Sequence, residues 1–181
     1  MASEFQRDKL LNMFRAFDAD GNGYLDQSDF RALADRWKEL PRVRPGSELA
    51  ARVEAVMLGW WDHLAAQADA NKDGKVDLDE ILAMVDRLHT MREVVAATAE
   101  TIFDAVDENG DGRISPGEHR RLVDTWHGER VDIADVFDRL DQDGDGYLSR
   151  PEFTELWIQF WVSDDPAEPG NHLCGAVPTR S

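Results

Sequence analysis

One twelve-residue pattern occurs four times in this chain, and that repetition limits what the chain can fold into. Each copy starts with Asp, carries Asp or Asn at its third and fifth positions, and has glycine at its sixth. An aliphatic residue follows at the eighth position and an acid at the twelfth. The copies span residues 18–29, 69–80, 107–118 and 141–152. Carboxylates gathered this closely repel one another unless a cation lies between them, so the pattern predicts four metal-binding loops.

The oxygen donors have the spacing of an EF-hand, in which a short loop between two helices wraps a hard cation. Side chains at the first, third, fifth, ninth and twelfth positions supply ligands, and the seventh residue supplies its backbone carbonyl. The predicted ligands are Asp18, Asp20, Asn22, Tyr24, Asp26, Asp29, Asp69, Asn71, Asp73, Lys75, Asp77, Glu80, Asp107, Asn109, Asp111, Arg113, Ser115, Glu118, Asp141, Asp143, Asp145, Tyr147, Ser149 and Glu152. We therefore expect up to four bound Ca²⁺.

The four loops differ in their ligand charge. The first, second and fourth loops each offer four acidic ligands, whereas the third offers three because Ser115 takes its ninth position. The first loop ends in Asp29, and aspartate is one methylene shorter than glutamate. Losing one ligand oxygen favours six-coordinate Mg²⁺ over Ca²⁺. We expect the first site to be weaker for calcium, or to hold Mg²⁺ as well.

Apolar residues recur at helical spacing on both sides of every loop, so the expected fold class is all-α. Four EF-hands would form two paired lobes packed into one compact globule. We expect hands 1 and 2 within residues 1–89, hands 3 and 4 within residues 90–162, and a Pro/Gly-rich tail at 163–181. Short two-stranded ribbons should join the paired loops at their eighth positions, Leu25 with Val76 and Ile114 with Leu148.

Local signals predict where several helices begin and end. Ser3 and Gln6 have the spacing of a capping box, as do the ninth and twelfth residues of the last three loops. Prolines within residues 41–46 end one helix, and a longer one should cover roughly residues 48–68. Thr90 and Glu93 predict a fresh capping box and a bend between the halves.

Composition excludes several classes of function. The net charge is −17, from 37 acidic residues against 20 basic ones, which leaves no electrostatic case for nucleic acid or an anionic membrane. The single cysteine, Cys174, rules out an internal disulfide framework. The N-terminus lacks the apolar core of a signal peptide, and the longest apolar run is too short to span a bilayer. We expect a cytoplasmic monomer whose protein partner, if it has one, the sequence does not identify.

The remaining polar residues do not indicate an enzyme. The five histidines are scattered without zinc-like spacing, which predicts surface or boundary positions. No nucleophile elbow or phosphate-binding loop is present. The six Trp and eight Phe are best interpreted as core residues.

The chain resembles calerythrin and the sarcoplasmic calcium-binding proteins, a branch of four-EF-hand proteins. The resemblance rests on the four loops, the long first connection, Asp29 closing the first loop, and the tail. Within the tail the matching residues are Phe160, Trp161, residues 163–166 and residues 169–171. The resemblance implies a compact cytosolic protein that buffers calcium. The second loop departs from the family, because such proteins often have a degenerate second site and this one keeps its ligands.

Three functions stay open at this point. A calcium buffer is favoured over a sensor because the five methionines do not cluster on the exiting helices, and a sensor commonly exposes a Met-rich groove. A carrier of a small apolar ligand, similar to a luciferin-binding protein, is the third possibility. Leu173, Cys174 and Val177 are apolar, so we expect the tail to dock on the apolar surface between the lobes. That surface should include Trp157, Phe160 and Trp161.

Overall fold

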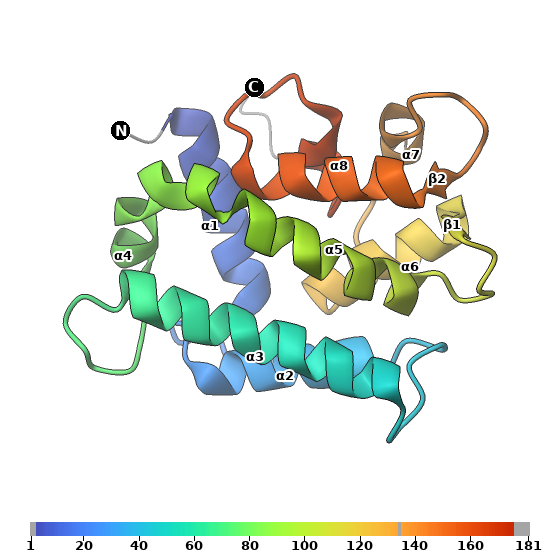
Figure 1. Ribbon diagram of the computed structural model, residues 1–181. Helices are drawn as coiled ribbons and strands as arrows, with labels where there is room; N and C mark the ends of the chain where they lie inside the picture. Colours follow the sequence, from blue (N-terminus) through green and yellow to red (C-terminus); the bar gives the residue numbers. More distant parts are fainter. Residues whose placement is uncertain (1–2, 134, 176–181) are drawn as a thin grey trace.

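The computed structural model describes residues 3–133 and 135–175 (Figure 1). The described chain is mainly helical, as predicted. The elements in chain order are α1 (Glu4–Phe17), α2 (Gln27–Lys38), α3 (Glu48–Ala68), α4 (Leu78–Ala83), the 3₁₀ helix η1 (Val85–Met91), α5 (Arg92–Val106), β1 (Arg113–Ile114), α6 (Pro116–His127), α7 (Val136–Leu140), β2 (Leu148–Ser149), α8 (Arg150–Val162) and the 3₁₀ helix η2 (Pro169–His172). The fold class predicted from the repeated loops is confirmed.

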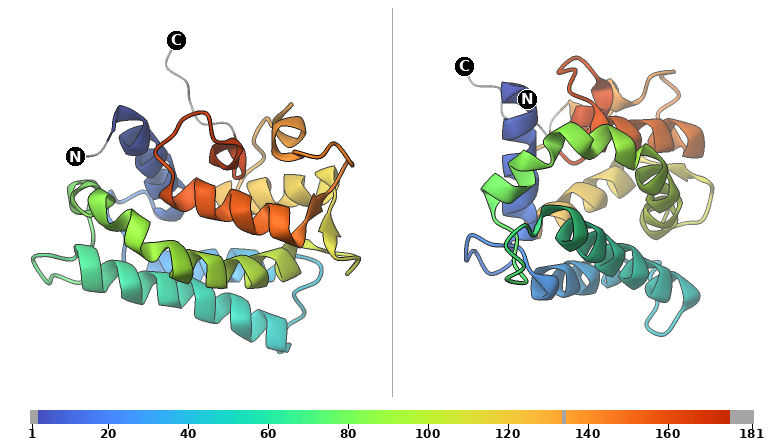
Figure 2. Two further views of the ribbon diagram at one scale, coloured as in Figure 1. Left: turned by 45° about the horizontal axis from the view of Figure 1, so that its top comes forward. Right: turned by 60° about the vertical axis from the view of Figure 1, so that its left-hand side comes forward.

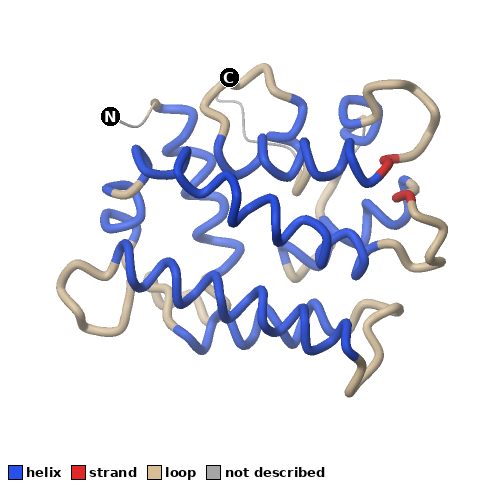
Figure 3. Tube along the Cα trace, in the orientation of Figure 1, coloured by secondary structure: helices blue, strands red, loops and turns tan. Residues whose placement is uncertain are grey.

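The loops pair through their eighth residues in both halves. In the N-terminal half, Leu25 and Val76 form an antiparallel bridge whose two N–H···O bonds measure 2.8 and 2.9 Å. In the C-terminal half, Ile114 of β1 lies opposite Leu148 of β2, and these strands are the short red segments in Figure 3. All four side chains are fully buried. Both predicted pairings are confirmed, the first as a single bridge.

Residues at the ends of the loops also start the exiting helices. The ninth residues Asp26, Asp77, Ser115 and Ser149 are the N-caps of α2, α4, α6 and α8. In each case the twelfth residue returns a side-chain bond to the backbone N–H of the ninth, which completes a capping box. Helix initiation and the proposed ion cage therefore depend on the same side chains.

The two halves share one aromatic core. Phe17 of α1 contacts Trp60 of α3, Trp126 of α6 and Trp161 of α8, with ring centroids 5.0–6.3 Å apart. Trp157 of α8 stacks on Trp60, with ring centroids 6.0 Å apart. Helices α2 and α3 lie side by side along one edge, and α5 and α8 run together above them (Figures 1 and 2). Separating the halves would expose these rings to water, which opposes opening of the globule.

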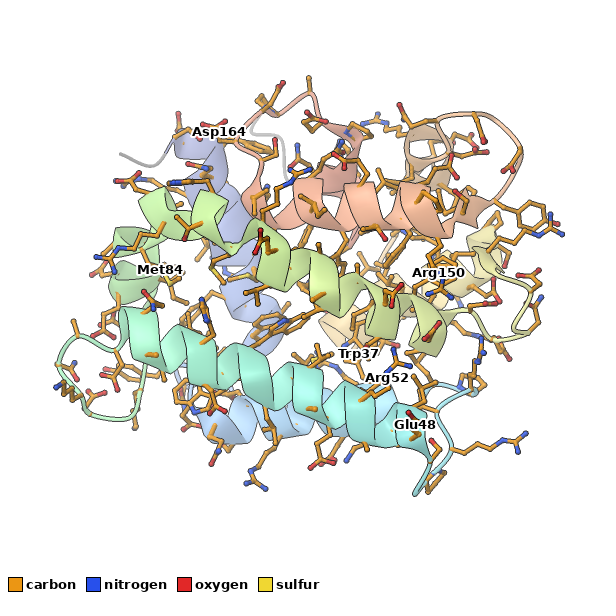
Figure 4. The ribbon with its side chains drawn as sticks, viewed as in Figure 1. Trp37, Glu48, Arg52, Met84, Arg150 and Asp164 are labelled. Carbon is orange, nitrogen blue, oxygen red and sulfur yellow. The ribbon has the colours of Figure 1, made fainter. Side chains whose placement is uncertain are left out.

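Polar contacts cross between the halves as well. Asp104 of α5 accepts hydrogen bonds from Arg52 of α3 at 3.0 Å and from Arg150 of α8 at 2.9 Å. Both arginines extend toward the space between α3, α5 and α8 in Figure 4. Arg36 of α2 donates to the backbone carbonyl of Trp126 at 2.7 Å. These bonds fix how the N-terminal helices sit on the C-terminal ones.

The described part of the tail packs on α8, α6 and α7. Leu173 and Cys174 are buried, and their backbone carbonyls are hydrogen-bonded to two histidines of α6. The His119 Nε2 to Leu173 O distance is 2.8 Å, and the His127 Nε2 to Cys174 O distance is 2.7 Å. Val177, which the docking hypothesis also included, lies outside the described residues.

Close packing explains one glycine in the tail. A Cβ at Gly170 would collide with the backbone carbonyl of Leu156 and with the side chain of Gln159. The Gly170 N–H donates to Gln159 Oε1 at 2.9 Å. Buried Lys9 of α1 adds bonds to Ser163 O at 2.7 Å and to Asn171 Oδ1 at 3.0 Å. The tail is therefore tied to α8 and to the first helix.

Two local expectations are wrong. Thr90 does not cap α5, because its hydroxyl donates to the Arg87 carbonyl at 2.6 Å inside η1, and α5 begins at Arg92 without a side-chain cap. The bend between the halves is made by this 3₁₀ turn. His119 is fully buried rather than at the surface, since the docked tail covers it. Among the described residues, no helix is long and apolar enough to cross a membrane.

Candidate metal centres

The first aspartate of every loop binds the amide of the sixth-position glycine. The distances from the glycine N to the Asp Oδ2 are 3.0 Å at Asp18, 3.0 Å at Asp69, 3.0 Å at Asp107 and 2.8 Å at Asp141. The glycine accepts this geometry because its φ is 78–85° in the four loops, a region that L side chains rarely adopt. One carboxylate oxygen is thus anchored and the side chain is aimed into the loop.

The fifth side chain of each loop binds the N–H of the seventh residue. Asn22, Asp73, Asp111 and Asp145 accept these bonds at 2.8–3.1 Å. Such bonds are local turns that Asx side chains favour. They hold the fifth side chain against the backbone of the seventh residue, whose carbonyl is a predicted ligand.

The twelfth residue closes each loop from the other side. Glu80 and Glu118 accept the N–H of the second residue with one oxygen and that of the ninth with the other, over 2.7–3.2 Å. Asp29 makes the same two bonds, to Ala19 at 3.1 Å and Asp26 at 2.9 Å, despite its shorter side chain. Glu152 accepts the Ser149 N–H at 2.8 Å. Asp29 therefore spans the first loop as Glu80 and Glu118 span the second and third.

Ligand oxygens come close together in two loops. Carboxylate oxygens of Asp18, Asp20 and Asp29 lie within 4.8 Å of one another, and a second group consists of Asp141, Asp143 and Asp145. Asp29 is buried, and burial raises the pKa of its carboxyl above the ordinary value. A divalent cation would offset both the repulsion and the lost hydration. The donor sets, oxygen throughout, fit Ca²⁺ or Mg²⁺.

One loop position is unusual. At the fourth position the first, third and fourth loops have glycine with φ of 68–72°, and the second loop has Lys72 with φ of 59°. A non-glycine residue in this left-handed region carries some backbone strain. The second loop nonetheless makes the same anchoring bonds as the others. Its first and twelfth side chains are therefore anchored as in the other loops, although proteins of the resembled family often have a degenerate second site.

Comparison with known protein families supports the interpretation of these loops as EF-hands. The family described as EF-hand domain pair matches residues 7–86 and 97–158, which together are most of the chain. The chain therefore belongs to the EF-hand family.

Within that family the similarity is to sarcoplasmic calcium-binding proteins. The protein of Scylla paramamosain is 33% identical over 111 residues, a match that covers 58% of either chain and so less than two thirds of that relative. Sarcoplasmic calcium-binding proteins II, V, VI and VII of Branchiostoma lanceolatum are 25% identical over 97% of this chain and 99% of theirs. Calerythrin of Saccharopolyspora erythraea is 24% identical over 65% of this chain and 70% of its own.

A solved structure has the same fold. The sarcoplasmic calcium-binding protein from amphioxus superposes with a TM-score of 0.76, covering 98% of this chain and all of that one at 22% identity. The resemblance predicted from the loops and tail is confirmed by these findings.

Arg42, a residue that contacts the predicted ligand Asp107, is missed by reasoning from the sequence alone. Arg42, in the connection between α2 and α3, donates to the backbone carbonyl of Asp107 at 2.7 Å. No motif marks an arginine separated from the third loop by this length of chain.

Proposed function

We propose that this protein binds up to four Ca²⁺ through the predicted ligands and acts as a calcium buffer in the cytoplasm. One observation carries the proposal. All four loops share the same bonds from the first carboxylate to the sixth amide and from the twelfth carboxylate to the ninth amide. The relatives are named as calcium-binding proteins, and the proposal extends calcium binding from them to this chain.

The packing between the halves favours a buffer over a sensor. A sensor exposes an apolar groove when its hands open. Here the apolar faces of the halves are packed against each other, and Trp37, Trp126 and Trp157 are at most 2% exposed. Opening would expose several indoles at once, so the ion-bound and ion-free forms should differ in helix order more than in exposed apolar surface.

Calorimetric titration of the metal-free protein with Ca²⁺, with and without millimolar Mg²⁺, tests ion binding. The expected result is up to four bound ions, with Mg²⁺ competing most strongly at the first loop. Fluorescence of an apolar-surface dye in the same samples tests the role. If the protein is a buffer, the dye fluorescence should stay low at saturating calcium. A calcium-dependent rise in dye fluorescence would identify a sensor. Sedimentation of the same samples checks the proposed monomer.

An apolar hollow favours a second candidate function, binding of a small apolar molecule. Its free volume is about 70 Å³, and it lies between α1, α2, α3, α4, η1, the start of α5 and the end of α8. Trp60 and Trp161 line it, and so do Met13 of α1 and Met84 and Met91 at the two ends of η1 (Met84 is labelled in Figure 4). Methionines adapt to irregular ligands.

Titration with an aromatic apolar probe, followed by quenching of tryptophan fluorescence, tests this second function. Val94 is 45% exposed and lines the hollow, so Val94→Trp should obstruct it and weaken probe binding without disturbing the ion sites. Equal probe binding by the wild type and Val94→Trp would place the probe elsewhere and count against the hollow as a binding site.

A further inference from the structure

Arg42 brings a positive charge from the N-terminal half to the third ion loop. It lies in the elbow, defined here as residues 39–47 between α2 and α3, at the lower right of Figure 1 and next to the third loop. Its guanidinium Nη1 donates to Asp107 O at 2.7 Å and lies 3.3 Å from Asp107 Oδ2. The same group packs beside Gly110. The contact therefore joins the elbow to the first predicted ligand of the third loop.

The elbow holds Arg42 in place through its neighbour. The side chain of Val43 is 3% exposed within the shared core, and its N–H donates to Leu40 O at 2.9 Å. Asp107 is also fixed, since it is 2% exposed and its two carboxylate oxygens accept the N–H groups of Gly110 and Gly112. Both partners are thus positioned by the fold, and the guanidinium does not have to be ordered by the ion.

The third loop already has the lowest ligand charge. It offers three acidic ligands where each other loop offers four. Arg113 at its seventh position lies 3.5 Å from Asp111 Oδ2, so a second guanidinium also contacts a ligand carboxylate. Within residues 3–133 and 135–175, the ion pairs that involve predicted ligand carboxylates are these two, both at the third loop. Cations concentrate at the site that has the fewest acids.

We propose that Arg42 sets the calcium affinity of the third site, lowering it by holding a positive charge against Asp107 from the other half of the protein. The inference rests on the proposed calcium binding. A fixed guanidinium repels an arriving divalent cation and neutralises part of the carboxylate that should attract it. The third site accordingly fills after the fourth, its partner in the same half.

Site-resolved NMR tests the proposal, because each loop has its own sixth-position glycine. The amide signals of Gly23, Gly74, Gly112 and Gly146 are followed in calcium-buffered solutions for the wild type, Arg42→Gln and Arg42→Lys. Arg44→Gln is the matched control, since it removes the same charge from another exposed position of the same elbow. Arg42→Gln should tighten calcium binding at Gly112 about tenfold and leave Gly146 unchanged. Arg42→Lys, which keeps the charge, and Arg44→Gln should stay within about threefold of the wild type.

The outcomes separate this inference from the proposed function. If no glycine amide of the wild type responds to calcium, the proposed function fails. If the wild type responds but Arg42→Gln leaves Gly112 unchanged or weakens it, Arg42 does not lower the affinity and the inference is overturned. Equal tightening by Arg42→Lys or Arg44→Gln also overturns it, because the effect would then not depend on this charge. Arg42→Met is a second neutral variant in case Arg42→Gln fails to fold.

Discussion

The guanidinium of Arg113 lies 3.9 Å from the ring centre of Tyr147, joining the seventh positions of the third and fourth loops. The N-terminal half repeats this arrangement, with the ammonium of Lys75 5.3 Å from the ring centre of Tyr24. Each half thus places one cation over one tyrosine between its paired loops. The seventh carbonyls are predicted ligands, so these contacts hold two neighbouring ion sites in register.

The Arg113–Tyr147 contact should have a measurable coupling energy. A double-mutant cycle with Arg113→Gln and Tyr147→Leu should give about 0.5–1 kcal/mol, as expected for a solvent-exposed cation–π pair. Urea unfolding at saturating calcium measures it. Tyr147→Phe keeps the ring and should preserve the coupling. A coupling near zero would mean that the two side chains stabilise the fold independently.

The second loop should bind an ion. Glu80→Gln removes one charge from the side chain that spans Ala70 and Asp77, so the calcium stoichiometry should fall by one. Asp79→Asn is the control, because it removes a charge from the same loop at a position without a predicted ligand. Calorimetry counts the ions. A wild type that binds three ions, with no change in Glu80→Gln, would show that the second loop does not bind.

The first loop should respond to the length of its last side chain. Asp29→Glu should raise the preference for Ca²⁺ over Mg²⁺, since the longer arm offers both oxygens more easily. Competition titrations with the two ions measure the ratio. Glu118→Asp in the third loop is the reciprocal change and should shift that site toward Mg²⁺. Unchanged selectivity in Asp29→Glu would indicate that the contacts of Asp29 with Ala19 and Asp26 already bring it close enough.

Lys9 should make stability depend on alkaline pH. Burial lowers the pKa of Lys9 from 10.5 to about 8, although Asp164 partly opposes this. Between these values the unfolded chain binds more protons than the folded one, so the free energy of unfolding rises as pH increases from 8 to 10.5. The wild type should gain up to about 3 kcal/mol relative to Lys9→Met over this range. Parallel stability profiles for the two proteins would contradict the shifted pKa.

The tail should stabilise the globule. Truncation after Val162 removes Leu173 and Cys174 and leaves His119 and His127 without their carbonyl partners. Thermal melting should occur at a lower temperature, and an apolar-surface dye should bind in the presence of calcium. Leu173→Ala alone should cost about 2–5 kcal/mol, because the side chain is fully buried.

A shorter truncation after Gly175 is the control for that experiment. It keeps Leu173 and Cys174 and measures the contribution of residues 176–181, which include Val177 and lie outside the described residues. If truncation after Val162 leaves both melting and dye fluorescence unchanged, the tail does not contribute to stability.

The sequence by itself determined the parts of this protein whose interactions are local. Ligand spacing, the positive-φ glycines and the capping boxes of α4, α6 and α8 involve residues within one twelve-residue loop. The pairing of Leu25 with Val76 and of Ile114 with Leu148 follows from the repeat of that unit. Helix α3, at Glu48–Ala68, matches its predicted span because an uninterrupted apolar periodicity precedes the second loop. Thr90 is the local failure, since its hydroxyl satisfies a carbonyl of the preceding turn.

Only the tertiary structure decided which distant residues meet. Arg42 reaches Asp107, His119 binds the Leu173 carbonyl, and Met13 of α1 lines the same hollow as Met84 and Met91. These partners lie far apart along the chain, and their side chains suit many alternative neighbours, so no spacing predicts them. Burial of the shared aromatic core selects them, because it fixes the orientation of the two halves. Each polar side chain at the surface of one half then lies against whichever group of the other half is opposite.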